Sequence, residues 1–166
     1  LWSKSLWYDE AQSVTFGILP VNELFEAVRL FDPHPPFYYY QLHYWLQLGT
    51  SDEWIKLNSV LWSMLTVWML YLLSKKVFGT QHALFSALLF SIVPSAVYYA
   101  QEVRMYAMLM FLAVSSFYML QLFYEKRHWL YLVAMFIFTM AIIYSHGSGF
   151  LVLVSLGIYA LCLWAK

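Results

Sequence analysis

The chain has 166 residues, of which 63% are hydrophobic, 21% are aromatic and 11% are charged, and its formal net charge is zero. Soluble proteins carry about 25% charged residues, so this composition excludes an ordinary soluble domain and indicates residence in a membrane. A net charge of zero gives no sign of a nucleic-acid partner.

Residues 1–53 are expected to form a loop outside the membrane that contains short helices. The segments WYDEAQSVTFGIL (7–19) and VNELFEAVRLF (21–31) mix apolar and charged residues at helical intervals. The run DPHPPFYYYQLHYWLQLG (32–49) opens with three prolines and is too short to cross a bilayer. Its many Tyr and Trp side chains favour an interfacial helix that lies on the outer leaflet.

Residues 54–166 are expected to form the membrane domain, a bundle of about five transmembrane helices in an all-α protein. Each of five apolar runs approaches the ~17–25 residues that a helix needs to cross a bilayer. The runs are Trp54–Leu73, Ala83–Tyr98, Met105–Phe123, Trp129–Tyr144 and Phe150–Trp164. Short links between them predict antiparallel helical hairpins. Because the chain begins with Leu1 inside a polar segment and ends on an apolar run, we expect an internal piece of a larger membrane protein.

Positive charges gather at one end of the predicted bundle. With alternating spans, that end receives Lys75, Lys76, Lys126, Arg127 and Lys166. Cytoplasmic loops carry an excess of Lys and Arg, so this end should be cytoplasmic. The first loop and the turns AQEVR (100–104) and SHGSG (145–149) then lie on the other side. We expect an integral protein of the cell membrane, plasma or bacterial inner, whose functional site faces away from the cytoplasm.

Acids and histidines on that side are candidates for chemistry. The pair Asp9–Glu10 either begins a solvated helix, where acids meet the positive end of the helix dipole, or supplies a general base. Prolines fix the backbone around His34. The imidazole is either held in one orientation for a function or simply exposed in a rigid turn. His146 lies in a glycine-rich turn, and it is a candidate because that turn is predicted on the same side of the membrane as the other candidate residues.

The segment VYYAQEVRMYAMLM (97–110) carries the strongest local signal, because Glu102 and Arg104 lie at the mouth of a hairpin with apolar flanks. A helix that began near Gln101 would place Glu102 and Tyr106 on one face, and Gln101 and Arg104 on another. The alternative is a salt-bridged turn with an arginine that reaches toward water.

A carboxylate suits a general base that deprotonates a hydroxyl. An arginine suits a phosphate, because its planar fork donates parallel hydrogen bonds and stays charged. Both groups at one membrane surface predict group transfer from a lipid-linked phosphate.

The segments LWYDEAQSV (6–14), FDPHPPFYYYQLHYWLQLG (31–49), YYAQEVRMYAMLM (98–110) and YSHGSG (144–149) resemble, in order and spacing, the polytopic glycosyltransferases of the GT-C type. The nearest group is family 39, the dolichyl- or polyprenyl-phosphate-mannose protein mannosyltransferases and their bacterial relatives. One departure is the triplet KLN (56–58), where that family often has an Arg-Leu-Pro-like triplet.

The resemblance implies inverting transfer of a sugar from a polyprenyl-phosphate donor to a protein, lipid or polysaccharide acceptor at the non-cytoplasmic face. It implies that Asp9 is the general base and that Glu10 orients Asp9 or the acceptor. It further implies that Arg104 binds the donor phosphate together with His34 and His146. The residues implied to support them are Gln101, Glu102 and Tyr106.

Metal dependence stays open. Related enzymes sometimes use a divalent ion, and hard oxygen and imidazole ligands are available here. The candidate ligands are Asp9, Glu10, His34 and Glu102, but their spacing is not diagnostic of a metal site, and no cofactor is assigned.

Two other classes of function also stay open. A transporter or channel subunit would place ionisable residues near the membrane midplane, whereas here they lie at the helix ends. A non-catalytic membrane scaffold would use the aromatic first loop to bind a partner.

Overall fold

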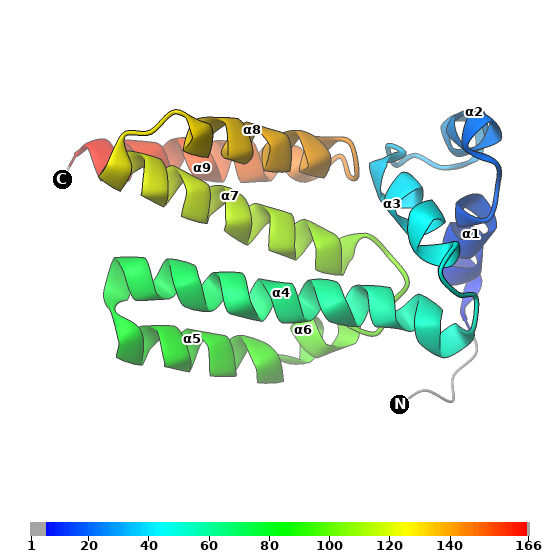
Figure 1. Cartoon of the computed structure of the whole chain (residues 1–166), viewed down its shortest axis with the longest axis horizontal. Coiled ribbons are helices and arrows are strands. Elements are labelled where there is room, and N and C mark those ends of the chain that lie inside the picture. The colour runs from blue at the N-terminus through cyan, green and yellow to red at the C-terminus, as the bar shows by residue number, and fades with distance from the viewer. Residues whose placement is uncertain (1–5, 166) are drawn as a thin grey trace.

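The computed structural model describes residues 6–165, and every regular element in that range is a helix (Figure 1). This confirms the predicted fold class, an all-α membrane helix bundle. Short helices come first in the chain, and longer apolar helices follow. The elements are α1 (Tyr8–Gly17), α2 (Val21–Phe31), α3 (Phe37–Leu46), α4 (Asp52–Phe78), α5 (Thr80–Ile92), α6 (Pro94–Tyr99), α7 (Tyr106–Lys126), α8 (Leu130–Ile143) and α9 (Gly149–Trp164).

Two of the described helices are long and apolar enough to cross a bilayer. They are α4, with 27 residues, and α7, with 21, and they match the first and third predicted spans. The other apolar helices, α5, α8 and α9, have 13, 14 and 16 residues. These are shorter than the ~20 residues that a straight span of the hydrocarbon core needs.

The second predicted span, Ala83–Tyr98, is not one helix, so this prediction was wrong. Helix α5 ends at Ile92, Val93 is extended, with φ −63° and ψ 125°, and α6 begins at Pro94. Proline has no N–H to continue the ladder, and its ring clashes with the carbonyl four residues earlier. The break therefore follows from Pro94, which is favoured at the first position of a new helix.

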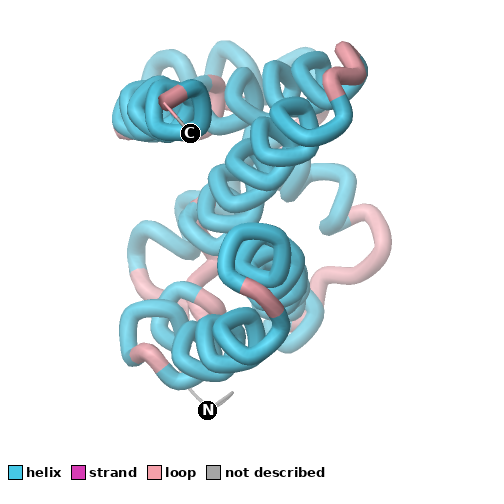
Figure 2. The backbone as a smooth tube through the Cα atoms, turned by 90° about the vertical axis from the view of Figure 1, so that its left-hand side faces the viewer, coloured by secondary structure: helices cyan, strands magenta, loops and turns pink. Residues whose placement is uncertain are grey.

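Helix α7 lies at the centre of the bundle, with α4 and α5 on one side and α8 and α9 on the other (Figures 1 and 2). Small side chains let these helices approach closely: Ser115 and Ser116 of α7 and Thr66 of α4 are completely buried. Large apolar side chains on the outer helices are exposed instead, among them Phe85, Leu88, Phe136, Ile137 and Leu151. An apolar surface of this extent fits contact with lipid.

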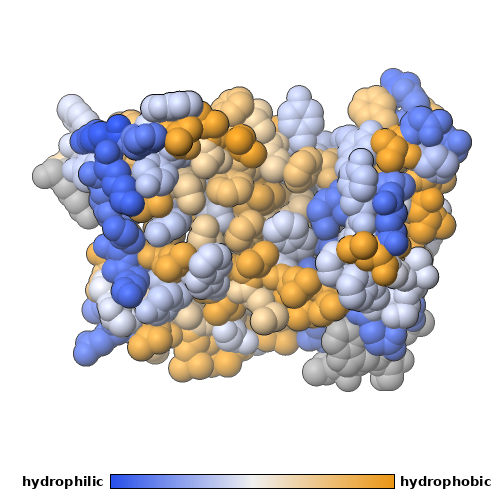
Figure 3. All heavy atoms as spheres, in the orientation of Figure 1, coloured by the Kyte–Doolittle hydropathy of each residue, from blue (hydrophilic) through white to orange (hydrophobic). Residues whose placement is uncertain are grey.

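Hydrophilic residues gather at the two ends of the molecule, with an apolar band between them (Figure 3). One end, which we call the lysine end, carries Lys75 and Lys76 of α4 and Lys126 of α7. Lys76 Nζ there lies 2.6 Å from Glu125 Oε2 and ties α4 to α7. Lys166, which was predicted to share this end, lies outside the described residues.

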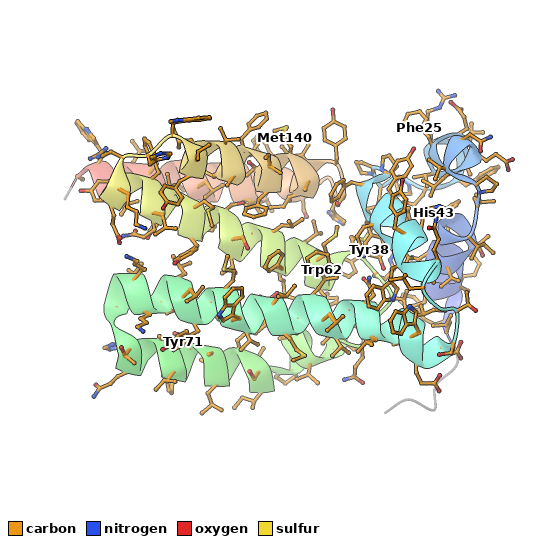
Figure 4. The ribbon with its side chains drawn as sticks, in the orientation of Figure 1. Phe25, Tyr38, His43, Trp62, Tyr71 and Met140 are labelled. Atoms are coloured by element: carbon orange, nitrogen blue, oxygen red, sulfur yellow. The ribbon has the colours of Figure 1, made fainter. Side chains whose placement is uncertain are left out.

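The other end, which we call the loop end, is covered by α1, α2 and α3 (Figure 1). These three helices confirm the short helices expected in the first loop. Helix α3 packs on α1 and on the end of the bundle, with Tyr38 and His43 on its opposite sides (Figure 4). The indoles of Trp45 and Trp54 stack at 4.6 Å, and each donates its Nε1–H to the backbone carbonyl of the other. This pair fixes α3 on the start of α4.

Candidate functional site

The loop end brings together segments that are far apart in the chain: α1, the turn before α3, the turn before α7 and the turn after α8. The N–H of Phe37 donates to the carbonyl of Tyr144 at 2.9 Å, which joins the start of α3 to the end of α8. Side chains from α1, α3, the turn before α7 and the end of α8 share one core, including Phe16, Tyr39, Val103 and Ile142.

Glu10 is 4% exposed, and both of its carboxylate oxygens accept hydrogen bonds from backbone N–H groups. Its Oε2 accepts the N–H of Trp7 at 3.1 Å, which caps the start of α1. Its Oε1 accepts the N–H of Val103 at 2.9 Å. Both bonds satisfy main-chain donors, so Glu10 holds α1 against the turn before α7.

Asp9 differs from its neighbour. Its side chain is partly exposed, and its carboxylate has no hydrogen-bond partner among the described residues. Its backbone carbonyl, however, accepts the hydroxyl of Ser13 at 2.9 Å and Nη1 of Arg104 at 3.4 Å. The carboxylate of Asp9 is therefore the acid of the pair that is available to another molecule.

Arg104 is 6% exposed and is held on two sides. Its Nη1 donates to Ser13 Oγ of α1 at 3.2 Å, and the guanidinium also interacts with the Tyr39 side chain of α3. An arginine has five N–H donors, so these contacts orient the group and leave donors for a ligand. The guanidinium of Arg104 thus lies against the main chain of Asp9.

Glu102 lies at the same place with its side chain 6% exposed. Its carbonyl accepts the hydroxyl of Ser59 on α4, and its carboxyl interacts with Tyr98. Burial raises the pKa of Glu102, and the nearby acids Glu10 and Asp9 raise it further, while Tyr98 and Arg104 oppose the shift. This carboxyl therefore keeps a proton more readily than an ordinary glutamate.

The helix expected from Gln101 does not form there, and that prediction was wrong. Helix α7 begins at Tyr106, and residues 101–105 are an irregular turn. The faces predicted for Gln101, Glu102, Arg104 and Tyr106 therefore do not apply. The turn places Glu102 and Arg104 together inward, while the Gln101 amide donates to the carbonyl of Val97 at 3.0 Å.

The two predicted histidines meet at the loop end. The rings of His34 and His146 have centroids 4.7 Å apart, and the ring of Tyr106 lies 5.9 Å from that of His146. His34 Nδ1 lies 2.7 Å from Asp32 Oδ1, and Asp32 Oδ2 accepts the hydroxyl of Tyr39 at 2.9 Å. Hydrogen bonds thus connect Tyr39 through Asp32 to His34, and Tyr39 also interacts with Arg104.

The sequence analysis did not single out Asp32, Ser13, Tyr38 or Tyr39. Asp32 lies two residues before His34 in the same proline-rich motif, so its spacing could have revealed it as a partner of the imidazole. Ser13 and the tyrosines gave no such signal, because their roles depend on contacts between α1, α3 and the turn before α7.

The candidate metal ligands Asp9, Glu10, His34 and Glu102 do not form a recognisable metal centre. Within residues 6–165, no group of three or more His, Cys, Asp or Glu side chains is arranged to hold an ion. Glu10 is also occupied by two backbone N–H groups.

The fold and the site define an integral membrane protein with a cluster of ionisable residues at one end of its helix bundle. A model of the dolichyl-phosphate-mannose-protein mannosyltransferase family matches residues 33–166, and the chain belongs to that family. It is thus a membrane glycosyltransferase of the mannosyltransferase type, and the family favours the enzyme over the transporter subunit and the scaffold. The matched range includes His34, Arg104 and His146 but not Asp9 or Glu10. Searches of curated proteins and of solved structures gave no significant match.

Proposed function

We propose that the protein transfers a sugar from a polyprenyl-phosphate donor to an acceptor hydroxyl or amine, in one inverting displacement with Asp9 as general base. The observation that carries the proposal is the contact of the Arg104 guanidinium with the backbone carbonyl of Asp9 at 3.4 Å, in a residue whose carboxylate has no hydrogen-bond partner among the described residues. The family supports a lipid-linked sugar donor, because its description names a dolichyl-phosphate-linked mannose.

In the proposed step, the Asp9 carboxylate takes the proton of the acceptor as the acceptor atom attacks the anomeric carbon. The bond from that carbon to the phosphate oxygen breaks, and its electron pair stays on the polyprenyl phosphate. Arg104 holds the negative charge that develops on this leaving group, because a buried guanidinium stabilises a phosphate more strongly than one in water. Glu10 keeps α1 in place, so that Asp9 stays beside Arg104.

The position of Arg104 next to the apolar bundle supports a donor whose chain lies in the membrane. A cleft of about 230 Å³ lies between α4, α5 and α6, and its lining includes Met64, Phe90 and Val97. Gln101, which precedes Glu102, also lines it. We propose that this cleft takes the part of the prenyl chain nearest the phosphate.

The distribution of charge supports a site on the non-cytoplasmic side of the cell membrane. The loop end carries the candidate site, and the opposite lysine end carries Lys75, Lys76 and Lys126. If the lysine end is cytoplasmic, as the positive-inside rule predicts, the site faces away from the cytoplasm.

The test is a transfer assay with the full-length protein in lipid nanodiscs, dolichyl-phosphate-mannose as donor, and peptide, lipid and polysaccharide acceptors. The Asp9→Asn variant should lose about 100-fold or more in rate, because a general base contributes roughly 10²–10⁴-fold. Thr15→Ala, an exposed change on the same helix, is the matched control. A normal rate for Asp9→Asn would overturn the role of Asp9, and no transfer by the wild type to any acceptor would overturn the function.

A further inference from the structure

The imidazoles of His34 and His146 are held in opposite tautomers. The carboxylate of Asp32 only accepts hydrogen bonds, so in the neutral ring His34 carries its proton on Nδ1 and leaves Nε2 as an acceptor. The backbone N–H of Ser148 donates to His146 Nδ1 at 3.0 Å, so in the neutral ring Nε2 carries the proton and is a donor. The pair therefore presents one acceptor and one donor.

Both Nε2 atoms are available to a ligand. Neither has a hydrogen-bond partner among the described residues, and the side chain of His34 is 20% exposed. Burial lowers the pKa of His146, and His34 and Arg104 lower it further. One acceptor and one donor side by side suit a hydroxyl group, which donates and accepts, better than a phosphate, which only accepts.

The surroundings link this pair to the proposed donor site. Asp32 is 4% exposed and joins His34 to Arg104 through Tyr39. The ring of Tyr106 next to His146 adds an apolar face, of the kind on which a sugar ring can lie. A sugar attached to a phosphate at Arg104 would thus find a polar pair and an aromatic ring close by.

We infer that His34 and His146 form a binding site for a sugar hydroxyl, with His34 Nε2 accepting from it and His146 Nε2 donating to it. Asp32 is the positioning residue that fixes His34 in this role. The inference rests on the proposed function, and it replaces phosphate binding by these histidines with recognition of the sugar. The hydroxyl belongs either to the sugar of the donor or to a carbohydrate acceptor.

The test measures equilibrium binding by the full-length protein in nanodiscs, so its outcome does not depend on turnover. The probes are dolichyl-phosphate-mannose, dolichyl phosphate without a sugar, and a mannose oligosaccharide as acceptor. His34→Asn keeps a polar atom near the Nδ1 position but loses Nε2, whereas His34→Gln keeps one near the Nε2 position. His82→Asn and His82→Gln, at the lysine end, are the matched control variants.

We expect His34→Asn to weaken binding of one sugar-bearing probe three- to tenfold, the usual effect of one lost hydrogen bond, while dolichyl phosphate binds as before. His34→Gln should retain most of the affinity, and the His146 variants should follow the same order. A loss confined to dolichyl-phosphate-mannose identifies the donor sugar, and a loss confined to the oligosaccharide identifies the acceptor.

Two outcomes would overturn the inference. One is unchanged affinity for both sugar-bearing probes in His34→Asn. The other is an equal loss of affinity for dolichyl phosphate, which would mean that these histidines bind the phosphate and not the sugar. If binding changes as expected but the wild type transfers no sugar, the hydroxyl site stands and the proposed transfer reaction fails.

Discussion

Glu10 and Val103 are joined across 93 residues by a hydrogen bond, in which the N–H of Val103 donates to Glu10 Oε1 at 2.9 Å. The bond fastens the first helix of the loop to the turn that carries Glu102 and Arg104. Two neighbouring acids therefore have different roles. Both carboxylate oxygens of Glu10 accept backbone N–H groups, whereas the carboxylate of Asp9 makes no such bond to the described residues.

This difference predicts opposite phenotypes for the two acids. Glu10→Ala leaves the buried N–H of Val103 without a partner and should lower the free energy of unfolding by about 1–3 kcal/mol. Asp9→Asn should change it by less than about 1 kcal/mol, since only a charge near a helix start is lost. Thermal unfolding of both variants in nanodiscs measures this, and equal losses would refute the role given to Glu10.

Arg104 should be needed for the donor phosphate more than for the fold. Arg104→Lys keeps the charge but loses the planar fork, so the Kd for dolichyl phosphate should rise about tenfold or more. Ser13→Ala is the control, because it removes one contact of the guanidinium at 3.2 Å and leaves the group in place. Equal effects of the two changes on the Kd would mean that Arg104 acts only through α1.

The adjacent residues Tyr38 and Tyr39 should respond oppositely to the loss of their hydroxyls. The hydroxyl of Tyr38 is buried without a hydrogen-bond partner among the described residues, so Tyr38→Phe should raise the free energy of unfolding by up to about 1 kcal/mol. The hydroxyl of Tyr39 donates to the buried carboxylate of Asp32, so Tyr39→Phe should lower the free energy of unfolding by roughly 1–3 kcal/mol. Chemical or thermal unfolding measures both, and a loss of stability in Tyr38→Phe contradicts the prediction.

His146 should make stability depend on pH in the acid range. Burial, His34 and Arg104 lower its pKa in the folded protein below the ordinary value of about 6.5. The unfolded chain therefore takes up the proton first, and this part of the stability is complete above pH ~6.5 and is lost as the pH falls toward the folded pKa. Melting temperatures of the wild type and His146→Gln between pH 8 and 5 should converge below pH ~6.5, whereas parallel curves would contradict the prediction. His82→Gln is the control.

Much of the architecture could be predicted from local sequence. Prolines before an aromatic run gave the start of α3, and apolar periodicity gave α1 and α2 close to their observed bounds. The same reasoning failed at Pro94. The apolar composition of residues 83–98 predicted one continuous helix, but the proline ends α5 and begins α6. It failed again at Gln101, because contacts of Glu10 and Ser59 with the main chain of residues 102–103 hold this segment as a turn.

The sequence by itself determined a membrane-embedded helix bundle, because composition and the length of apolar runs are properties of single segments. It also placed acids, an arginine and two histidines on one side, because alternating spans assign loops to sides. Only the tertiary structure decided which of two adjacent acids is free, and that Asp32 links His34 to Tyr39 and Arg104. Those facts depend on hydrogen bonds between residues far apart in the chain, whose partners no local pattern specifies.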